Sequence, residues 1–292
     1  MRSSSDSGCP KGPTHCSKTE NQGDHPGNSR SRIKLFIVGT GPGNVSHMSD
    51  RAKEVIRAAD CIAGYTTYME LIKDLVKDKQ VISTGMMKEI DRVEQAIDAA
   101  LSGSSCALVS GGDPGIYAMA GLVFELCEKR GVSISRPNQD RGEETQTLEI
   151  EVIPGIPALA AGAALAGAPL THDFAAISLS DLLTRWETIE KRISCAAMAD
   201  FVIVLYNPKS KKRDWQLGRA RELILEQRKG STPVAVVTGA MRENQKIEFT
   251  TLDAMDRADV GMQTVLFIGS NASLKYMDFM FTPRGYTRKY TD

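Results

Sequence analysis

The chain has 292 residues, with 36 basic and 36 acidic side chains and a formal net charge of zero. Hydrophobic residues make up 41% and charged residues 25%, as in an ordinary globular protein. The balanced charge argues against a nucleic-acid-binding protein, whose surface is normally basic. No stretch is apolar enough to span a membrane, and the polar N-terminus lacks the apolar core of a secretory signal. We therefore expect a cytoplasmic protein with room for two domains.

Residues 1–32 are rich in Ser, Gly, Pro and Asn without periodicity, and we expect them to be a disordered tail. They hold two cysteines and two histidines, but the spacing matches no standard metal site, so we expect no bound metal. The four other cysteines lie in apolar patterns and are expected to be buried thiols in a reducing compartment: Cys61, Cys106, Cys127 and Cys195.

Strands and helices alternate from residue 33 to residue 168, which predicts an α/β domain with a parallel or mixed sheet. Apolar runs predict strands at 33–38, 61–63, 80–82, 106–110 and 148–153. Helical spacing predicts helices from Asp50, over 68–76, from Glu89, over 119–126 and over 158–166. The helix from Glu89 is expected to bury Ile90, Val93, Ile97 and Leu101. A polar stretch at about 136–147 is expected to be a flexible insert.

The pattern restarts beyond Pro169, which predicts a second α/β domain over 169–286 and a polar tail at 287–292. Strands are expected at 174–178, 201–206, 233–238, 246–251 and 263–268, and helices at 184–198 and 215–228. The connections after residue 233 are short, so antiparallel pairing and a mixed sheet are expected in this half.

Glycines and prolines interrupt the chain where predicted strands end, at 39–43, 111–115, 154–157, 207–208 and 239. A single break is more often a plain turn, and Asp113 in the second break can cap the following helix as readily as it can contact a ligand. The carboxyl ends of parallel strands meet at one edge of a sheet. Five breaks together therefore predict a shared cleft.

Two common classes of site are disfavoured. The third glycine position of the dinucleotide-binding fingerprint holds Asn44, and Pro42 removes a backbone donor that a phosphate would need. A nicotinamide site is therefore not expected. His47 and His172 are the only histidines beyond residue 32, so a hydrolase that depends on a catalytic histidine is not favoured.

Three of these segments resemble the signatures of the tetrapyrrole methyltransferases of the cobalamin pathway: Val-Gly-Thr-Gly-Pro-Gly at 38–43, Gly-Gly-Asp-Pro-Gly-Ile-Tyr at 111–117 and Val-Ile-Pro-Gly-Ile at 152–156. Gly64-Tyr65 with Tyr68, and the stretches 168–183 and 282–286, resemble the branch that methylates C17 of precorrin-3B or cobalt-factor III. The resemblance runs from about residue 34 to 286. Pro114 and Pro157 depart from it, because relatives often carry Ala at the first position and Thr or Ser at the second.

The resemblance implies a two-domain tetrapyrrole-methylase architecture with an interdomain cleft that binds S-adenosylmethionine, and a homodimer. The cofactor contacts that it implies are Pro42, Gly111, Gly112, Asp113, Ile116, Pro157, Ala158, Asn207 and Ala240. We expect the tetrapyrrole substrate to contact Gly41, Tyr117, Lys209, Arg242 and Arg284. Each of these basic residues is individually more often a solvated charge than a ligand.

The implied reaction is methyl transfer to C17 with contraction of the macrocycle. Transfer from a sulfonium is an in-line displacement, so the protein mainly aligns donor and acceptor. Ring contraction also moves a proton, and His172, Asp173 and Ser180 are the candidates for a general acid or base. Alternatively, the first two brace the strand that begins at 174. Two other functions stay open: a methyltransferase of this fold with another target (another precorrin position, ribosomal RNA or diphthine), and a non-catalytic ligand-binding relative.

Overall fold

The computed structural model describes residues 33–139, 147–210 and 213–289. The tail 1–32, most of the expected insert and the last residues of the chain lie outside the described residues, so the expectations for them stay predictions. From Arg32 onward the chain forms one unit, within which the expected domain boundary near residue 168 also stays a prediction.

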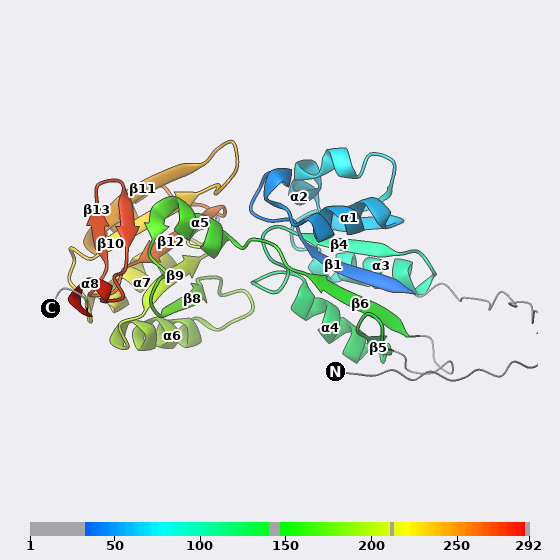
Figure 1. The fold of residues 1–292 in the computed structure, drawn as a ribbon. Coiled ribbons are helices and arrows are strands. Elements are labelled where there is room, and N and C mark those ends of the chain that lie inside the picture. Colours follow the sequence, from blue (N-terminus) through cyan, green and yellow to red (C-terminus); the bar gives the residue numbers. More distant parts are fainter. Residues whose placement is uncertain (1–32, 140–146, 211–212, 290–292) are drawn as a thin grey trace, which may run out of the picture. The chain divides into compact units, whose positions relative to one another are not determined.

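The first sheet has six parallel strands in the order β3-β2-β4-β1-β6-β5 (Figure 1). They are β1 (Lys34–Gly39), β2 (Cys61–Tyr65), β3 (Gln80–Thr84), β4 (Cys106–Ser110), β5 (Ile134–Ser135) and β6 (Leu148–Ile153). The helices are α1 (Asp50–Ala58), α2 (Thr66–Leu71), α3 (Glu89–Leu101) and α4 (Ala120–Lys129), with short 3₁₀ turns at Val45–His47 and Lys73–Leu75. The predicted parallel sheet is confirmed.

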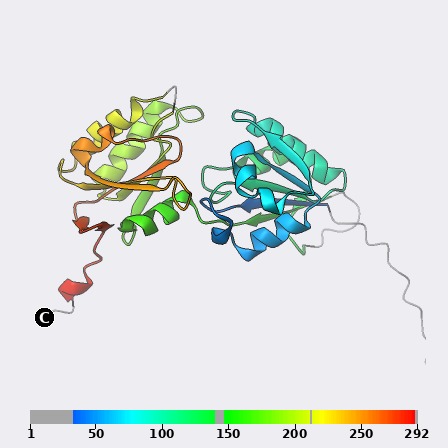
Figure 2. The same ribbon diagram turned by 90° about the horizontal axis from the view of Figure 1, so that it is seen from above.

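Helices cover both faces of this sheet, α1 and α2 on one and α3 and α4 on the other (Figures 1 and 2). The expected inward face of α3 is confirmed at Val93 and Ile97, which are fully buried. It is wrong at Ile90, whose side chain is 54% exposed, because Arg92 takes the buried position in the first turn. The apolar pattern alone does not predict that Ile90 is exposed and Arg92 is buried.

The second sheet has five strands in the order β11-β10-β12-β9-β8. They are β8 (Phe174–Ser178), β9 (Val202–Tyr206), β10 (Pro233–Thr238), β11 (Lys246–Thr251) and β12 (Thr264–Ile268). Only the β8–β9 pair is parallel, so the predicted mixed sheet with antiparallel pairing after residue 233 is confirmed. Helices α6 (Trp186–Met198) and α7 (Gln216–Leu225) and the 3₁₀ segment Leu252–Arg257 pack on one face.

Helix α5 (Ala158–Ala166) covers the other face of the second sheet. It consists almost entirely of alanine, and Gly162 allows it to lie very close to the strands. A Cβ at Gly162 would stand only 2.9 Å from the ring of Phe267. The small residues of this helix therefore have a packing role.

A third sheet joins β7 (Gly167–Ala168) to the hairpin of β13 (Leu274–Tyr276) and β14 (Phe279–Phe281), and α8 (Tyr286–Lys289) follows. The sequence pattern did not predict these elements, because strands of two or three residues are too short to show a periodicity.

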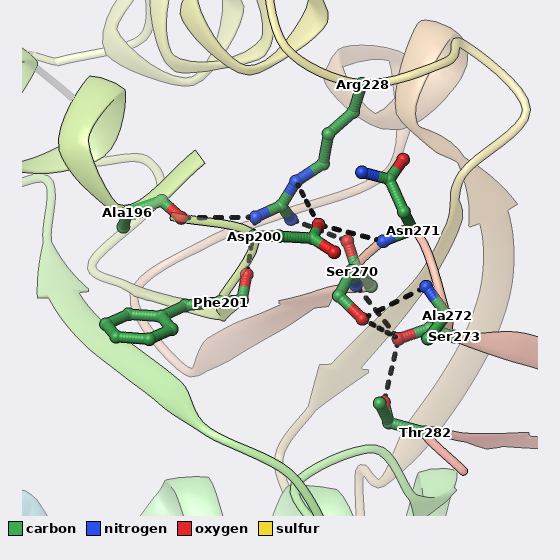
Figure 3. A network of polar contacts seen from close by, with 10 residues as sticks. Ala196, Asp200, Phe201, Arg228, Ser270, Asn271, Ala272, Ser273 and Thr282 are labelled. Carbon is green, nitrogen blue, oxygen red and sulfur yellow. Dashed lines mark hydrogen bonds and ion pairs between the residues drawn. The ribbon is translucent and has the colours of Figure 1, made fainter. Parts of the chain in front are cut away.

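The buried side chain of Arg228 joins three segments of the second half (Figure 3). Its guanidinium donates to the backbone carbonyls of Gly269, Ala196 and Phe201 and lies 3.7 Å from Asp200 Oδ1. Burial lowers the pKa of Arg228 because water no longer solvates the charge. The three carbonyl oxygens, which are the negative ends of the peptide dipoles, partly replace this lost solvation of the guanidinium charge.

A second part of this network holds the segment after β14 in place. The hydroxyl of Thr282 lies 2.7 Å from Ser273 Oγ (Figure 3). It also donates to the carbonyl of Pro169 at 2.8 Å. The Thr282 backbone N–H also donates to the Ala168 carbonyl. The start of the 282–286 segment that resembles the C17 branch therefore has a structural role.

Three of the four expected buried thiols, those of Cys61, Cys106 and Cys127, are buried and free. The expectation is wrong for Cys195, which is exposed because the buried stripe of α6 runs through Ile189, Ile193, Ala196 and Ala197. Within the described ranges, no helix is long and apolar enough to cross a lipid bilayer.

Candidate active site

Three of the predicted breaks lie side by side, because the strands that they follow are neighbours in the order β4-β1-β6. Gly41 and Gly112 exchange two backbone hydrogen bonds, of 3.1 and 2.7 Å, between the loops after β1 and β4. The backbone N–H and hydroxyl of Thr40 both donate to the carbonyl of Ser110. The carboxyl ends of β1 and β4 thus continue as a paired unit beyond the sheet.

The loop after β6 packs against the loops after β1 and β4 so closely that no Cβ atom would fit between their backbones at Gly39 or Gly155. A Cβ at Gly155 would lie 2.2 Å from the carbonyl oxygen of Gly112, and one at Gly39 would lie 2.6 Å from the Gly155 nitrogen. Gly112 requires glycine for another reason, its φ of +70°. The three loops approach this closely only because these positions carry no side chain.

Asp113 joins the loops after β4 and β6. Its Oδ1 accepts a hydrogen bond from the Gly115 N–H at 2.8 Å, and its Oδ2 accepts one from the Gly155 N–H at 3.1 Å. The carboxylate thus has a bracing role in the structure, and direct contact with a ligand stays a prediction. The adjacent Pro114 is buried, and its carbonyl accepts from the Ala120 N–H that opens α4.

Tyr206 meets the N-terminus of α5. Its hydroxyl accepts a hydrogen bond from the Leu159 N–H at 2.8 Å, and its ring centroid lies 5.1 Å from that of Tyr117. Burial raises the pKa of Tyr206 to about 12, so the phenol is neutral at physiological pH. Sequence reasoning missed this residue. The available signal was its place directly before Asn207-Pro208, at a strand end.

Tyr117 extends from the loop after β4 to β8. Its φ is +53°, and its hydroxyl donates to the Ala176 carbonyl at 2.9 Å. The loops after β1, β4 and β6, together with the first residue of α5, contain the cofactor contacts that were expected before residue 168. These are Pro42, Gly111, Gly112, Asp113, Ile116, Pro157 and Ala158.

In the second sheet, β8, β9 and β10 run in the same direction and end at one edge. Asn207 follows β9 with a φ of +52°, and its Nδ2 donates to Ser178 Oγ at 2.9 Å. The Ser180 N–H donates to the same oxygen at 3.2 Å. Ser180 and Asn207 are thus brought together at this edge.

The loop after β10 contacts the loop after β1. Arg242 Nε donates to the Pro42 carbonyl at 2.8 Å, and a Cβ at Gly43 would lie 2.6 Å from Arg242 Cγ. Ala240, two residues earlier, is buried. The Nε of Arg242 thus has a structural partner, and binding of a substrate carboxylate by its guanidinium stays a prediction.

His172 and Asp173 are not brought together with Ser180. They precede β8, whereas Ser180 follows it, so one strand length of roughly 17 Å separates them. Both side chains are exposed. The Asp173 carbonyl accepts from the Val202 N–H at 3.1 Å, as the bracing alternative expects, and the catalytic role of the pair stays a prediction without support from this geometry.

Lys209 and Arg284 are exposed. Lys209 lines a cavity of about 160 Å³ with Asp214 and Trp215. This volume is small beside the roughly 300 Å³ or more of usual ligand pockets. Substrate contacts by these two residues stay predictions. Among residues 33–139, 147–210 and 213–289, no three His, Cys, Asp or Glu side chains are grouped as a metal would require.

The hydroxyl of Ser110 is a further feature of the strand ends. It is buried at the end of β4 and has no hydrogen-bond partner among the described residues. Buried polar groups are normally paired, which makes this hydroxyl a candidate contact for a ligand.

The family model of the tetrapyrrole (corrin/porphyrin) methylases matches residues 34–256. A Priestia megaterium protein named "Cobalt-factor III methyltransferase" is 45% identical over 258 residues, which are 88% of this chain but only 46% of that protein. The chain therefore spans about half the length of this relative. A Salmonella typhimurium protein named "Probable cobalt-factor III C(17)-methyltransferase" is 45% identical over 253 residues, which are 87% of this chain and 99% of that protein.

Solved structures share the fold. The crystal structure of the methyltransferase CobJ aligns with a TM-score of 0.76 and 34% identity, over 85% of this chain and 99% of that one. A uroporphyrin-III C-methyltransferase from Thermus thermophilus, solved in complex with S-adenosylhomocysteine, aligns with a TM-score of 0.61 and 19% identity, over 81% of this chain and 97% of that one. At this lower identity the likeness concerns the fold alone.

Proposed function

The chain belongs to the tetrapyrrole methylase family, and on that premise we propose that it transfers a methyl group from S-adenosylmethionine to C17 of cobalt-factor III or of precorrin-3B. The observation that carries the proposal is the 45% identity to a named C17-methyltransferase over nearly the full length of that relative. We further propose two domains that meet at the cleft and a homodimer, as the resemblance implies, and a cytoplasmic location, as the composition of the chain implies.

The residues at the strand ends fit S-adenosylmethionine. The cofactor is a polar nucleoside with an amino-acid tail, and it needs backbone donors, small walls and close approach. The glycine loops after β1 and β4, the orphaned Ser110 hydroxyl and the alanine-rich start of α5 supply these features. Ala158 begins that helix, so its N–H has no intrahelical partner and is available to a ligand.

When bound, S-adenosylmethionine supplies a methyl group already activated on sulfur. The task of this chain is then to hold the acceptor carbon in line with that group. Gly41 and Gly112 fix the two central loops to each other, and Tyr206 fixes the start of α5. Of the three candidates for moving a proton during ring contraction, Ser180 lies at the edge of the second sheet where β8 and β9 end, beside Asn207, whereas His172 and Asp173 lie at the opposite end of β8.

The test is anaerobic incubation of the full chain with S-[methyl-¹⁴C]adenosylmethionine and either cobalt-factor III or precorrin-3B. We expect label in the tetrapyrrole and a product one methylene heavier by mass spectrometry. The tetrapyrrole that is methylated decides whether the natural substrate carries cobalt. Label in another precorrin, RNA or protein would replace the proposal with a related methyltransferase, and cofactor binding without transfer to any acceptor would favour a ligand-binding relative.

Asp113→Ala should weaken S-adenosylmethionine binding about tenfold, because it removes two charge-assisted hydrogen bonds that hold the loops after β4 and β6 together. Isothermal titration calorimetry measures the change. Asp74→Ala is the matched control, because that carboxylate is exposed and pairs only with Lys77 on its own turn. Equal affinities of both variants and the wild type would contradict the bracing role.

A further inference from the structure

The carboxyl edge of the first sheet continues past the glycine loops to β2 and β3. Beyond β3, the connection to α3 and the first turn of α3 expose a group of apolar residues: Met86 is 59% exposed, Met87 79% and Ile90 54%. Met87 also has a φ of +65°, a conformation that non-glycine residues seldom adopt and that is often found at functional sites. This exposed apolar group, Met86, Met87 and Ile90, is called the methionine rim below.

Arg92 holds the backbone beneath the methionine rim. Its Nε donates to Thr84 Oγ1 at 2.7 Å and its Nη2 to the Gly85 carbonyl at 2.9 Å. The side chain is only 3% exposed, and it makes no ion pair with a carboxylate of the described residues. Burying a guanidinium without a carboxylate partner costs free energy. Its hydrogen bonds to Thr84 and Gly85 offset part of this cost and hold the loop backbone in place.

Ring contacts connect this loop to the proposed cofactor site. The Arg92 guanidinium lies 5.8 Å from the ring centroid of Tyr65, whose ring meets that of Tyr68 edge-on at 5.4 Å. The Tyr68 ring in turn packs against Gly111, where a Cβ would stand 2.5 Å from it. Contacts therefore run from Thr84 and Gly85, which directly precede the methionine rim, to the loop after β4.

We propose that the methionine rim seats one face of the tetrapyrrole ring, and that Arg92 is a positioning residue that holds the rim beside the methyl donor. The inference rests on the proposed function. A tetrapyrrole is large and flat, with an apolar face and a carboxylate-bearing periphery. Methionine suits such a face, because its flexible, polarisable side chain adapts to an extended π-surface.

The test compares Met86→Ser/Met87→Ser with Met277→Ser. Met277 is a matched control, since it is 70% exposed and has a φ of +49° in the β13–β14 turn. Because the rim residues are exposed, the double variant should fold normally. We expect its KM for cobalt-factor III to rise roughly tenfold or more, from the lost apolar contact, while the Kd for S-adenosylmethionine stays unchanged. Met277→Ser should change neither value.

Arg92→Lys tests the positioning role, since lysine keeps the charge but cannot bond Thr84 and Gly85 in the same planar geometry. We expect it to raise the KM for the tetrapyrrole and leave kcat nearly unchanged. An unchanged KM in the double methionine variant of an active enzyme overturns this inference alone, as does a changed oligomeric state with an unchanged KM. A wild-type chain that methylates no tetrapyrrole overturns the proposed function instead.

Discussion

Gly155→Ala is expected to reduce S-adenosylmethionine affinity at least a hundredfold and to lower the free energy of unfolding by about 3 kcal/mol. The added Cβ would stand 2.2 Å from the Gly112 carbonyl oxygen and 3.0 Å from Gly39 Cα. Neither neighbour can yield cheaply, because both are backbone and Gly112 is tied to Gly41 by two hydrogen bonds. The loop after β6 must therefore move away, and the Gly155 hydrogen bond to Asp113 is lost with it.

Calorimetry and urea denaturation measure the two effects of this substitution. Gly121→Ala is the control, because a Cβ there meets no atom within 4 Å and the position lies in α4. It should leave binding unchanged and stabilise the chain by up to about 1 kcal/mol, since alanine favours helices over glycine. Wild-type affinity in Gly155→Ala would show that the three loops are not closely packed when the cofactor binds.

Arg228→Met is expected to lower the free energy of unfolding by about 3 kcal/mol or more while leaving the S-adenosylmethionine affinity of the folded chain unchanged. Methionine keeps much of the apolar stem but leaves the carbonyls of Gly269 and Phe201 buried without their donor. The residue lies in the second half of the chain, and its polar partners among the described residues, Ala196, Asp200, Phe201 and Gly269, all lie outside the glycine loops after β1, β4 and β6.

Urea denaturation followed by circular dichroism measures this change. Arg219→Met on α7 is the matched control, because its ion pairs with Glu190 and Glu222 lie at the surface and should contribute no more than about 1 kcal/mol. A similar loss of stability in both variants would contradict the structural role of the buried network in Figure 3.

Most helices and strands were predictable from the sequence, because their apolar periodicity extends over enough residues to be recognised. The alternation of strands and helices marks the first sheet, and short connections mark antiparallel pairing in the second. The order β4-β1-β6 was not predictable, because it depends on which distant segments pair. It is this order that brings the loops of Gly41, Gly112 and Gly155 together.

The errors at single residues share a physical origin. Ile90 matches the helical stripe but is exposed, because the buried position in the first turn of α3 is taken by Arg92, a residue that an apolar pattern does not count. Arg92 and Tyr206 were missed for a related reason. From sequence alone, a charged residue on a helix is expected to face the solvent, and an aromatic residue in a strand is expected to lie in the core. Only tertiary contacts reveal what the guanidinium and the phenol hold.

The central position of β1 has a consequence for how the chain folds. Among the described residues this strand is the first in chain order, yet its partners β4 and β6 follow only at residues 106–110 and 148–153. One edge of β1 therefore stays unpaired until β4 has been synthesised and the other until β6 has, and pairing between such distant segments is intrinsically slow. Because the loop after β6 joins the other two glycine loops only at this last step, a ligand bound to all three loops favours the finished sheet by mass action.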